Sequence, residues 1–132
     1  MKHLEDEHQR ALVKWADVQR LNALHGFTGT IGSYLIHVPN GGKRDKREAG
    51  RFKAQGVRAG FPDLFLFLPV RGMHGLAIEL KAPPATRTGQ KAKPTSKQLG
   101  WIKKLNEQGY RALVCHGWFE AKEAILEYLY EK

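Results

Sequence analysis

Apolar residues recur along the chain with a helical period in three segments. In the first of them, Ala11, Trp15 and Val18 are spaced by four and three positions, so they share one face of a helix. Leu99, Ile102 and Leu105 follow the same rule later in the chain, and Gly109 is suited to ending that helix. Amphipathic helices are therefore predicted at about 3–24, 96–107 and 118–131.

Shorter apolar runs bounded by turn-forming residues predict four strands, at 30–40, 63–68, 76–81 and 110–116. The runs 63–68 and 76–81 are apolar at consecutive positions, as expected for central strands that are covered on both faces. The segment 41–60 is rich in glycine and in basic residues, and it is predicted to be a loop.

These elements follow the order α-β-β-β-α-β-α, which predicts an α/β fold. The β-helix-β segment near the end suggests a parallel crossover, and therefore a central mixed four-stranded sheet flanked by helices. No internal repeat is present, and a chain of 132 residues has the length of one typical domain. We expect a single domain that spans residues 1–132.

The net charge is strongly positive, because 22 Lys and Arg residues stand against 13 Asp and Glu residues, which gives +9. Such an excess favours a nucleic acid or an anionic surface as the partner, although a basic protein without such a partner is the alternative. The basic residues gather in 41–60 and 86–97, and these segments could also be merely solvated loops. The candidate phosphate contacts are Lys43, Arg44, Lys46, Arg47, Arg51, Lys53, Arg58, Lys91, Lys93 and Lys97.

The remaining composition narrows the class of protein. No apolar run approaches the roughly 18 residues that span a bilayer, and the N-terminal segment lacks the apolar stretch of a signal peptide. The single cysteine, Cys115, cannot form an internal disulfide. The six histidines show no metal-binding spacing. We expect a cytoplasmic protein without a membrane partner or an organic cofactor.

Asp63 stands at the mouth of an apolar strand, where an aspartate is either a turn residue or a functional group on a rigid element. If 63–68 and 76–81 form an antiparallel hairpin that turns near Arg71 and Gly72, Asp63 faces residues 79–81. Side chains alternate along a strand, so Glu79 and Lys81 share a face. Two carboxylates and an amine should then converge at one end of the hairpin.

Two neighbouring carboxylates favour a divalent cation, and oxygen ligands suit Mg²⁺ or Mn²⁺. A lysine beside them could orient a water molecule or stabilise negative charge on a phosphate. On a basic chain this combination suggests the hydrolysis of a phosphodiester. The alternative is a cluster of ion pairs at the strand ends.

The letters "PD" at 62–63 and "ELK" at 79–81 resemble the Pro-Asp…(Asp/Glu)-x-Lys signature of restriction-endonuclease-like nucleases. The context is more specific. The stretches "GVRAGFPDLFLF", "AIELK", "SKQLGWIKKLNEQGYRALVC", "HVPNGG" and "EDEHQ" closely resemble the VRR-NUC (virus-type replication-repair nuclease) family. The resemblance covers essentially the whole chain and is to the stand-alone, phage-type form.

The resemblance implies a role for each matching residue. Asp63, Glu79 and the Leu80 backbone carbonyl would be metal ligands, and Lys81 would be the catalytic lysine. Glu7, on the first helix, would complete the acidic site or hold a second metal, although an acid in a first helical turn also stabilises the helix dipole. Gln98 would lie beside the lysine, and it would also close a capping box with Thr95.

The resemblance to this family implies a restriction-endonuclease-like fold. It also implies a Mg²⁺- or Mn²⁺-dependent endonuclease that cuts branched DNA. Stand-alone members are similar to Holliday junction resolvases, which act as homodimers and make paired incisions. Two alternatives remain open at this point. One is a non-catalytic basic DNA-binding protein of the same fold, and the other is an RNA-directed nuclease.

Overall fold

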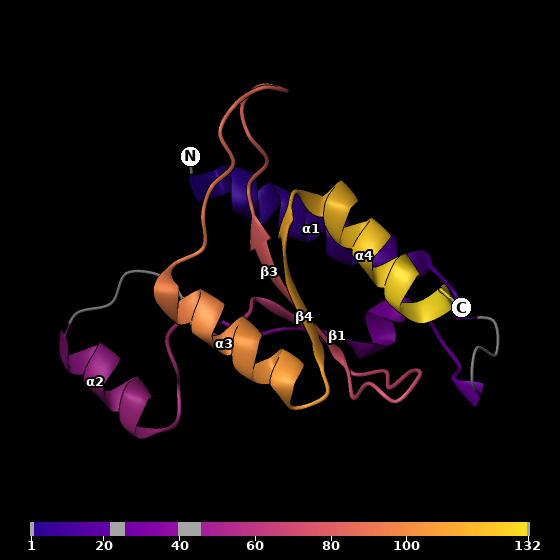
Figure 1. Cartoon of the computed structure of the whole chain (residues 1–132), viewed down its shortest axis with the longest axis horizontal. Helices are drawn as coiled ribbons and strands as arrows, with labels where there is room; N and C mark the ends of the chain where they lie inside the picture. Colours follow the sequence, from indigo (N-terminus) through magenta and orange to yellow (C-terminus); the bar gives the residue numbers. More distant parts are fainter. Residues whose placement is uncertain (1, 22–25, 40–45, 132) are drawn as a thin grey trace.

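The computed structural model of the protein describes residues 2–21, 26–39 and 46–131 (Figure 1). Its elements in chain order are the helix α1 (Lys2–Val18), the 3-10 helix η2 (Ile31–Tyr34), the strand β1 (Leu35–His37), the helix α2 (Lys46–Ala54), the strands β2 (Leu64–Leu66) and β3 (Leu76–Lys81), the helix α3 (Ser96–Glu107), the strand β4 (Arg111–His116) and the helix α4 (Trp118–Tyr130). No helix in this part of the chain is both long and apolar enough to cross a membrane.

The four strands form one sheet in the order β1-β2-β3-β4. The strands β1, β2 and β3 pair antiparallel, whereas β4 runs parallel to β3. A parallel pair needs a crossover connection, which α3 provides. The predicted mixed four-stranded sheet flanked by helices is therefore confirmed.

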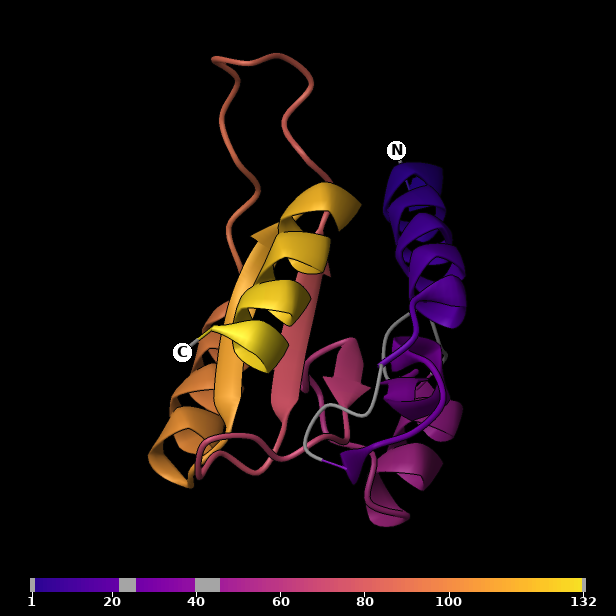
Figure 2. The same ribbon diagram turned by 90° about the vertical axis from the view of Figure 1, so that its right-hand side faces the viewer.

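The two faces of the sheet are covered by different helices (Figure 2). On one face, Leu66 and Ile78 pack with residues of α1 and α4, among them Leu12 and Ile125. On the other face, Phe65 and Ala77 pack against Leu105 of α3. Because both faces are covered, β2 and β3 are apolar at consecutive positions, as the sequence indicated.

The first helix differs from its prediction in length and in buried face. It ends at Val18, and residues 22–25 lie outside the described residues. The side chains of Leu12 and Ala16 are fully buried, whereas Val18 is 70% exposed. The predicted stripe of Ala11, Trp15 and Val18 is therefore wrong in its last member. The buried stripe is rotated by about one residue.

The predicted strand at 30–40 is mostly not a strand. Its first part forms η2, which a reciprocal capping box between Thr30 and Ser33 stabilises. Gly32 there packs so closely on α1 that an added Cβ would lie 2.8 Å from the Asp17 Cα. The backbone turns against α1 at this point, which leaves only Leu35–His37 to pair with β2.

The predicted loop at 41–60 contains a nine-residue helix, α2 (Lys46–Ala54), and residues 40–45 lie outside the described residues. Lysine, arginine and alanine have high helix propensities, and they outweigh the single Gly50 within the helix. The Arg58 guanidinium donates a hydrogen bond of 2.9 Å to the Lys53 carbonyl near the helix end. The prediction of a loop is therefore wrong for residues 46–54. It relied on the glycine content and the charge of the segment, whereas the helix propensity of its residues favours a helix.

The remaining boundaries lie close to the predicted ones. The strand β3 and the helix α3 have the predicted bounds, β4 begins one residue later, and α4 ends one residue earlier. The strand β2 is shorter than 63–68, and Asp63 stands immediately before it. The connection 82–95 between β3 and α3 projects away from the body of the molecule (Figures 1 and 2). The His116 ring tethers it, because Nε2 lies 2.8 Å from the Ala92 carbonyl oxygen.

Candidate active site

The register of the β2–β3 hairpin brings the two carboxylates together. Leu64 pairs with Ile78, so the next position outward places Asp63 opposite Glu79. The predicted hairpin register is confirmed. Asp63, Glu79 and Lys81 share the face of the sheet that α3 covers, since Phe65 and Ala77 on that face pack against Leu105.

Asp63 is held by hydrogen bonds from two neighbouring strands. Its Oδ2 accepts a hydrogen bond of 2.9 Å from the Leu80 N–H of β3. Its backbone carbonyl accepts a bond of 2.8 Å from the Val38 N–H and lies 3.0 Å from His37 Nδ1. Pro62, directly before it, is fully buried. The carboxylate is therefore fixed on a rigid support.

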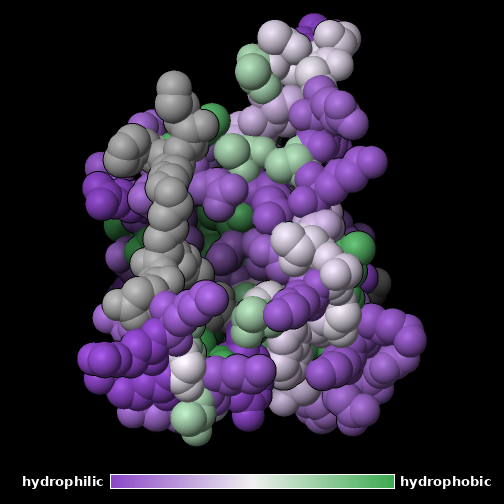
Figure 3. Space-filling model, turned by 90° about the vertical axis from the view of Figure 1, so that its left-hand side faces the viewer, coloured by the Kyte–Doolittle hydropathy of each residue, from purple (hydrophilic) through white to green (hydrophobic). Residues whose placement is uncertain are grey.

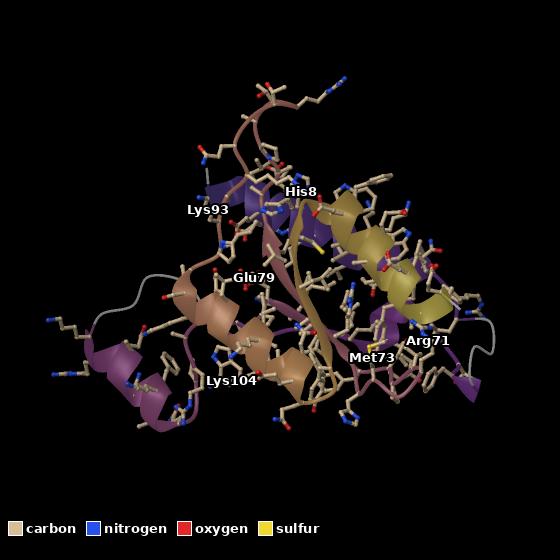
Figure 4. The ribbon with its side chains drawn as sticks, viewed as in Figure 1. His8, Arg71, Met73, Glu79, Lys93 and Lys104 are labelled. Carbon is tan, nitrogen blue, oxygen red and sulfur yellow. The ribbon has the colours of Figure 1, made fainter. Side chains whose placement is uncertain are left out.

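Glu79 is the one charged side chain that is buried among the described residues, and it is 3% exposed. Its Oε2 accepts a hydrogen bond of 3.0 Å from Gln98 Nε2, and Lys81 Nζ lies 3.7 Å from the same oxygen. Figure 4 shows Glu79 between β3 and the beginning of α3. A buried carboxylate has a high desolvation cost, which the amide and the ammonium offset only in part.

The capping box at the start of α3 fixes how Gln98 meets Glu79. The Gln98 Oε1 accepts a hydrogen bond of 2.8 Å from the Thr95 N–H, and the Gln98 N–H donates one of 3.2 Å to Thr95 Oγ1. With its oxygen engaged in the cap, the side-chain amide turns its NH₂ group toward Glu79. The two roles that the sequence suggested for Gln98, helix capping and proximity to the site, are therefore both present in the structure.

The electrostatics of the site centre on Glu79. Burial raises the pKa of this carboxyl to about 8, and the Asp63 carboxylate adds to the shift, while Lys81 opposes it. A side-chain hydrogen bond with Asp63 also raises the pKa, so the two carboxyls are in contact. Without a cation, the pair therefore retains a proton near neutral pH.

The first helix also contributes a charge to this site. Glu5 adds to the raised pKa of Glu79, whereas Glu7, exposed like Glu5, is not among the charges that shift it within the described residues. Glu5 lies seven residues before Leu12 and eleven before Ala16, on the face of α1 that is buried. Sequence reasoning missed Glu5 because it took the wrong stripe as the buried face. The role of Glu7 stays a prediction.

The donor set of the site fits a hard divalent cation. Across residues 2–21, 26–39 and 46–131, no three His, Cys, Asp or Glu side chains group closely enough to hold a metal ion. Mg²⁺ is commonly bound by one or two carboxylates and completes its shell with water and substrate phosphate. Asp63 and Glu79, with a proton that a cation would displace, match this pattern. The Leu80 carbonyl stays a predicted further ligand.

The predicted phosphate contacts that the structure describes are exposed on α2, on the segment after it, on the projecting connection and on α3. The exposed basic residues of α2 and of the segment just after it are Lys46, Arg47, Arg51, Lys53 and Arg58. Lys91 and Lys93 are exposed on the projecting connection, and Lys97 is exposed in the first turn of α3. Lys43 and Arg44 lie outside the described residues. Figure 3 shows the face that carries α2 and the projecting connection, and hydrophilic residues predominate on it.

The segment before Asp63 packs directly on the start of α3. Gly60 adopts a φ of +87°, and an added Cβ would lie 2.8 Å from the Lys97 carbonyl carbon and 3.0 Å from the Gln98 nitrogen. Only glycine combines this backbone conformation with this approach. The contact sets the distance between the segment that carries Asp63 and the helix that carries Gln98.

Comparisons with known proteins agree with this geometry. The sequence model of the VRR-NUC domain family matches residues 5–119. A solved structure described as a VRR_NUC domain protein superposes with a TM-score of 0.78 and 29% identity, covering 96% of this chain and 88% of that chain. A search of curated proteins found no match. The chain belongs to the VRR-NUC domain family, a family of nucleases, and it has a restriction-endonuclease-like fold.

Proposed function

We propose that the protein is a Mg²⁺- or Mn²⁺-dependent endonuclease that cuts branched DNA, acting as a Holliday junction resolvase. One observation carries the proposal. The buried Glu79 carboxyl contacts Asp63 and has Lys81 Nζ at 3.7 Å, on a chain with a net charge of +9. Membership of a nuclease family supports the reaction class.

Asp63 and Glu79 are the residues that would hold the cation. A divalent cation there would act as a Lewis acid that lowers the pKa of a water molecule and stabilises charge on the scissile phosphate. The protein supplies the orientation of both carboxylates, through the Leu80 N–H for Asp63 and the Gln98 amide for Glu79. Because one support is a strand N–H and the other is a side-chain amide fixed by the cap of α3, the ligands need little rearrangement when the cation binds.

Lys81 supplies a positive charge at the same site. Its side chain is 13% exposed, so its ammonium acts in a partly desolvated environment where charges interact strongly. An ammonium in this position can donate a hydrogen bond to a phosphate oxygen as negative charge develops in the transition state. Removal of Lys81 should therefore lower the rate of cleavage more than the affinity for DNA.

The choice of branched DNA and of a homodimer rests on the distribution of positive charge and on the reaction. Phosphate contacts from lysine and arginine give affinity without sequence specificity. The exposed basic residues of α2 and of the connection 82–95 could contact separate duplex arms. Resolution of a four-way junction requires two cuts, which a homodimer with one active site in each copy provides.

The experiment is a panel of four-way junctions, flaps, duplexes and single strands, each with Mg²⁺, Mn²⁺ or EDTA. Lys81→Ala and Asp63→Asn should lower cleavage of the preferred substrate by a factor on the order of 100 or more, while DNA binding is retained. Lys103→Ala is the matched control, because Lys103 is exposed and pairs only with Glu107 in the next turn of α3 among the ion pairs of the described residues. A mass measurement of the particle tests the homodimer.

Four results would contradict parts of the proposal. Normal cleavage by Lys81→Ala, or cleavage in EDTA, would show that Asp63, Glu79 and Lys81 do not form the active site. Binding of all substrates without any cleavage by the wild-type protein would favour a non-catalytic DNA-binding protein. A faster reaction on RNA junctions than on DNA junctions would reassign the substrate. Mn²⁺ titration by calorimetry gives a separate readout, in which Asp63→Asn should bind at least about tenfold more weakly.

A further inference from the structure

A pocket with a volume of about 510 Å³ lies beside the carboxylate pair. Its lining includes Val38, Val57, Arg58, Phe61 and Trp101. The volume falls within the range of about 300–1,000 Å³ that is typical of sites for small organic groups. The lining is largely apolar and aromatic, with one guanidinium, so the pocket differs in chemistry from the acidic site next to it.

Both walls of the pocket are joined to the candidate active site. On one wall, Phe61 lies two residues before Asp63, and the Val38 N–H donates its hydrogen bond of 2.8 Å to the Asp63 carbonyl. On the other wall, Trp101 lies three residues after Gln98, about one turn along α3. A DNA strand with its scissile phosphate at Asp63 would therefore bring a neighbouring nucleotide toward this pocket.

The aromatic side chains of the pocket are already held in place. The rings of Phe61 and Trp101 meet edge to face, with centroids 5.1 Å apart and an interplanar angle of 77°. Lys104, labelled in Figure 4, places its Nζ 4.5 Å from the centroid of the Trp101 ring. A ring fixed by two neighbours loses little conformational freedom when it stacks on a ligand.

We propose that this pocket binds an unpaired nucleobase of the nucleotide next to the scissile phosphate. Nucleobases stack on aromatic side chains regardless of sequence, and an adjacent cation suits the neighbouring phosphate. A base inside a duplex is stacked and paired, so it cannot enter without being extruded. This inference rests on the proposed nuclease function, and it gives that function a way to select branch points where a base is unpaired or has been extruded from the duplex.

The test measures binding, so that it does not depend on cleavage. Lys81→Ala is the parent protein, and the probe is a flapped DNA whose nucleotide next to the cut is either intact or abasic. The abasic change should weaken binding to the parent about tenfold, in line with the energy of one base stacked on an aromatic ring. In the Lys81→Ala, Trp101→Ala double variant, the same change should have no effect. Trp101→Phe, in the same Lys81→Ala parent, should retain part of the difference in affinity between intact and abasic DNA.

Leu99→Ala is the matched control, because Leu99 is an apolar residue of α3 that is 51% exposed and lies outside the pocket lining. It should show the full tenfold difference between intact and abasic DNA. A 2-aminopurine base at the same nucleotide gives a second readout, since stacking on Trp101 should quench its fluorescence and Trp101→Ala should restore it. Thermal unfolding of each variant identifies any that fail to fold.

An equal effect of the abasic change with and without the Trp101 ring would overturn the inference. A second copy of the chain is the competing occupant. If Trp101→Ala lowers the particle mass and leaves the difference between intact and abasic DNA unchanged, the pocket is a dimer contact and the inference fails. The proposed function fails by a different result, which is the absence of metal-dependent cleavage by the wild-type protein on every DNA of the panel.

Discussion

Gln98 donates a hydrogen bond of 3.0 Å to Glu79 with one end of its side-chain amide while the other end caps α3. The cap fixes which end faces the carboxylate, because the oxygen is engaged by the Thr95 N–H. A helix-capping interaction thereby sets the polarity of a group in the candidate active site. The two functions can be separated by substitution.

Gln98→Glu should keep the cap and damage the site. A glutamate at this position still accepts from the Thr95 N–H, but it places a carboxylate where the amide donated to Glu79. A like charge raises the pKa of Glu79 further, by about one unit, so the pH above which Mn²⁺ binds without displacing a proton should rise by about one unit. Calorimetric titration with Mn²⁺ between pH 6 and pH 9 measures this change in the pKa of Glu79. The range is chosen because it brackets the pKa of about 8 in the native site.

Ser96→Glu is the control for this substitution. It adds the same charge to the first turn of α3, at an exposed residue that is not a hydrogen-bond partner of Glu79 in the described part of the chain. Its Mn²⁺ affinity should match that of the wild-type protein at every pH. Equal behaviour of the two variants would show that the contact between Gln98 and Glu79 is unimportant for the cation.

Glu5→Gln should weaken cation binding and cleavage more than Glu7→Gln. Glu5 adds to the raised pKa of Glu79 and lies on the buried face of α1, while Glu7 lies on the face of the exposed Val18. We expect a loss of about twofold to threefold for Glu5→Gln and no measurable loss for Glu7→Gln, since Glu5 is exposed and makes the smallest of the contributions to the raised pKa of Glu79. Mn²⁺ titration and cleavage rates measure both. The reverse order would support the predicted role of Glu7 in the acidic site.

The metal-free protein should become less stable as the pH rises from about 4.5 to about 8. Below this window, Glu79 is protonated in the folded and the unfolded states. Within it, the unfolded chain loses the proton at its ordinary pKa while the folded protein retains it, so the free energy of unfolding falls. One pKa unit corresponds to about 1.36 kcal/mol, so the loss is on the order of a few kcal/mol.

Urea unfolding in EDTA across this range measures the loss. Glu79→Gln should flatten the profile, because the glutamine does not titrate. Addition of Mn²⁺ should restore stability at the upper end, where the deprotonated pair binds the cation. A steep loss that persists in Glu79→Gln would assign the pH dependence to another group.

Gly60→Ala should destabilise the protein and slow cleavage. The added Cβ would meet the backbone of Lys97 at 2.8 Å and force the start of α3, with Gln98, away from Asp63. Gly72→Ala is matched in conformation, with a φ of +80° against +87°, but nothing lies within 4 Å of its Cβ. Gly60→Ala should therefore cost about 1–3 kcal/mol more in the free energy of unfolding than Gly72→Ala. Unfolding in urea and cleavage rates test this, and equal costs would mean that the backbone conformation alone matters.

Local signals in the sequence determined much of this fold. The bounds of β3 and α3 agree with their predictions because a turn, a capping box and a terminal glycine mark them within a few residues. Side-chain alternation and the position of the hairpin turn predicted that Asp63 would face Glu79, and the observed register agrees. These properties depend on neighbours along the chain, so they can be read without the tertiary structure.

Only the tertiary structure decided which face of α1 is buried and how deeply Glu79 is buried. Helical periodicity states which residues share a face, but it does not state how a helix is rotated against the sheet. Leu12 and Ala16 proved to be the buried stripe, and this brings Glu5 rather than Glu7 onto the buried face. The pocket at Phe61 and Trp101 also joins segments 40 residues apart, as their numbers in the sequence show. Packing between distant segments creates such features, and no local pattern encodes them.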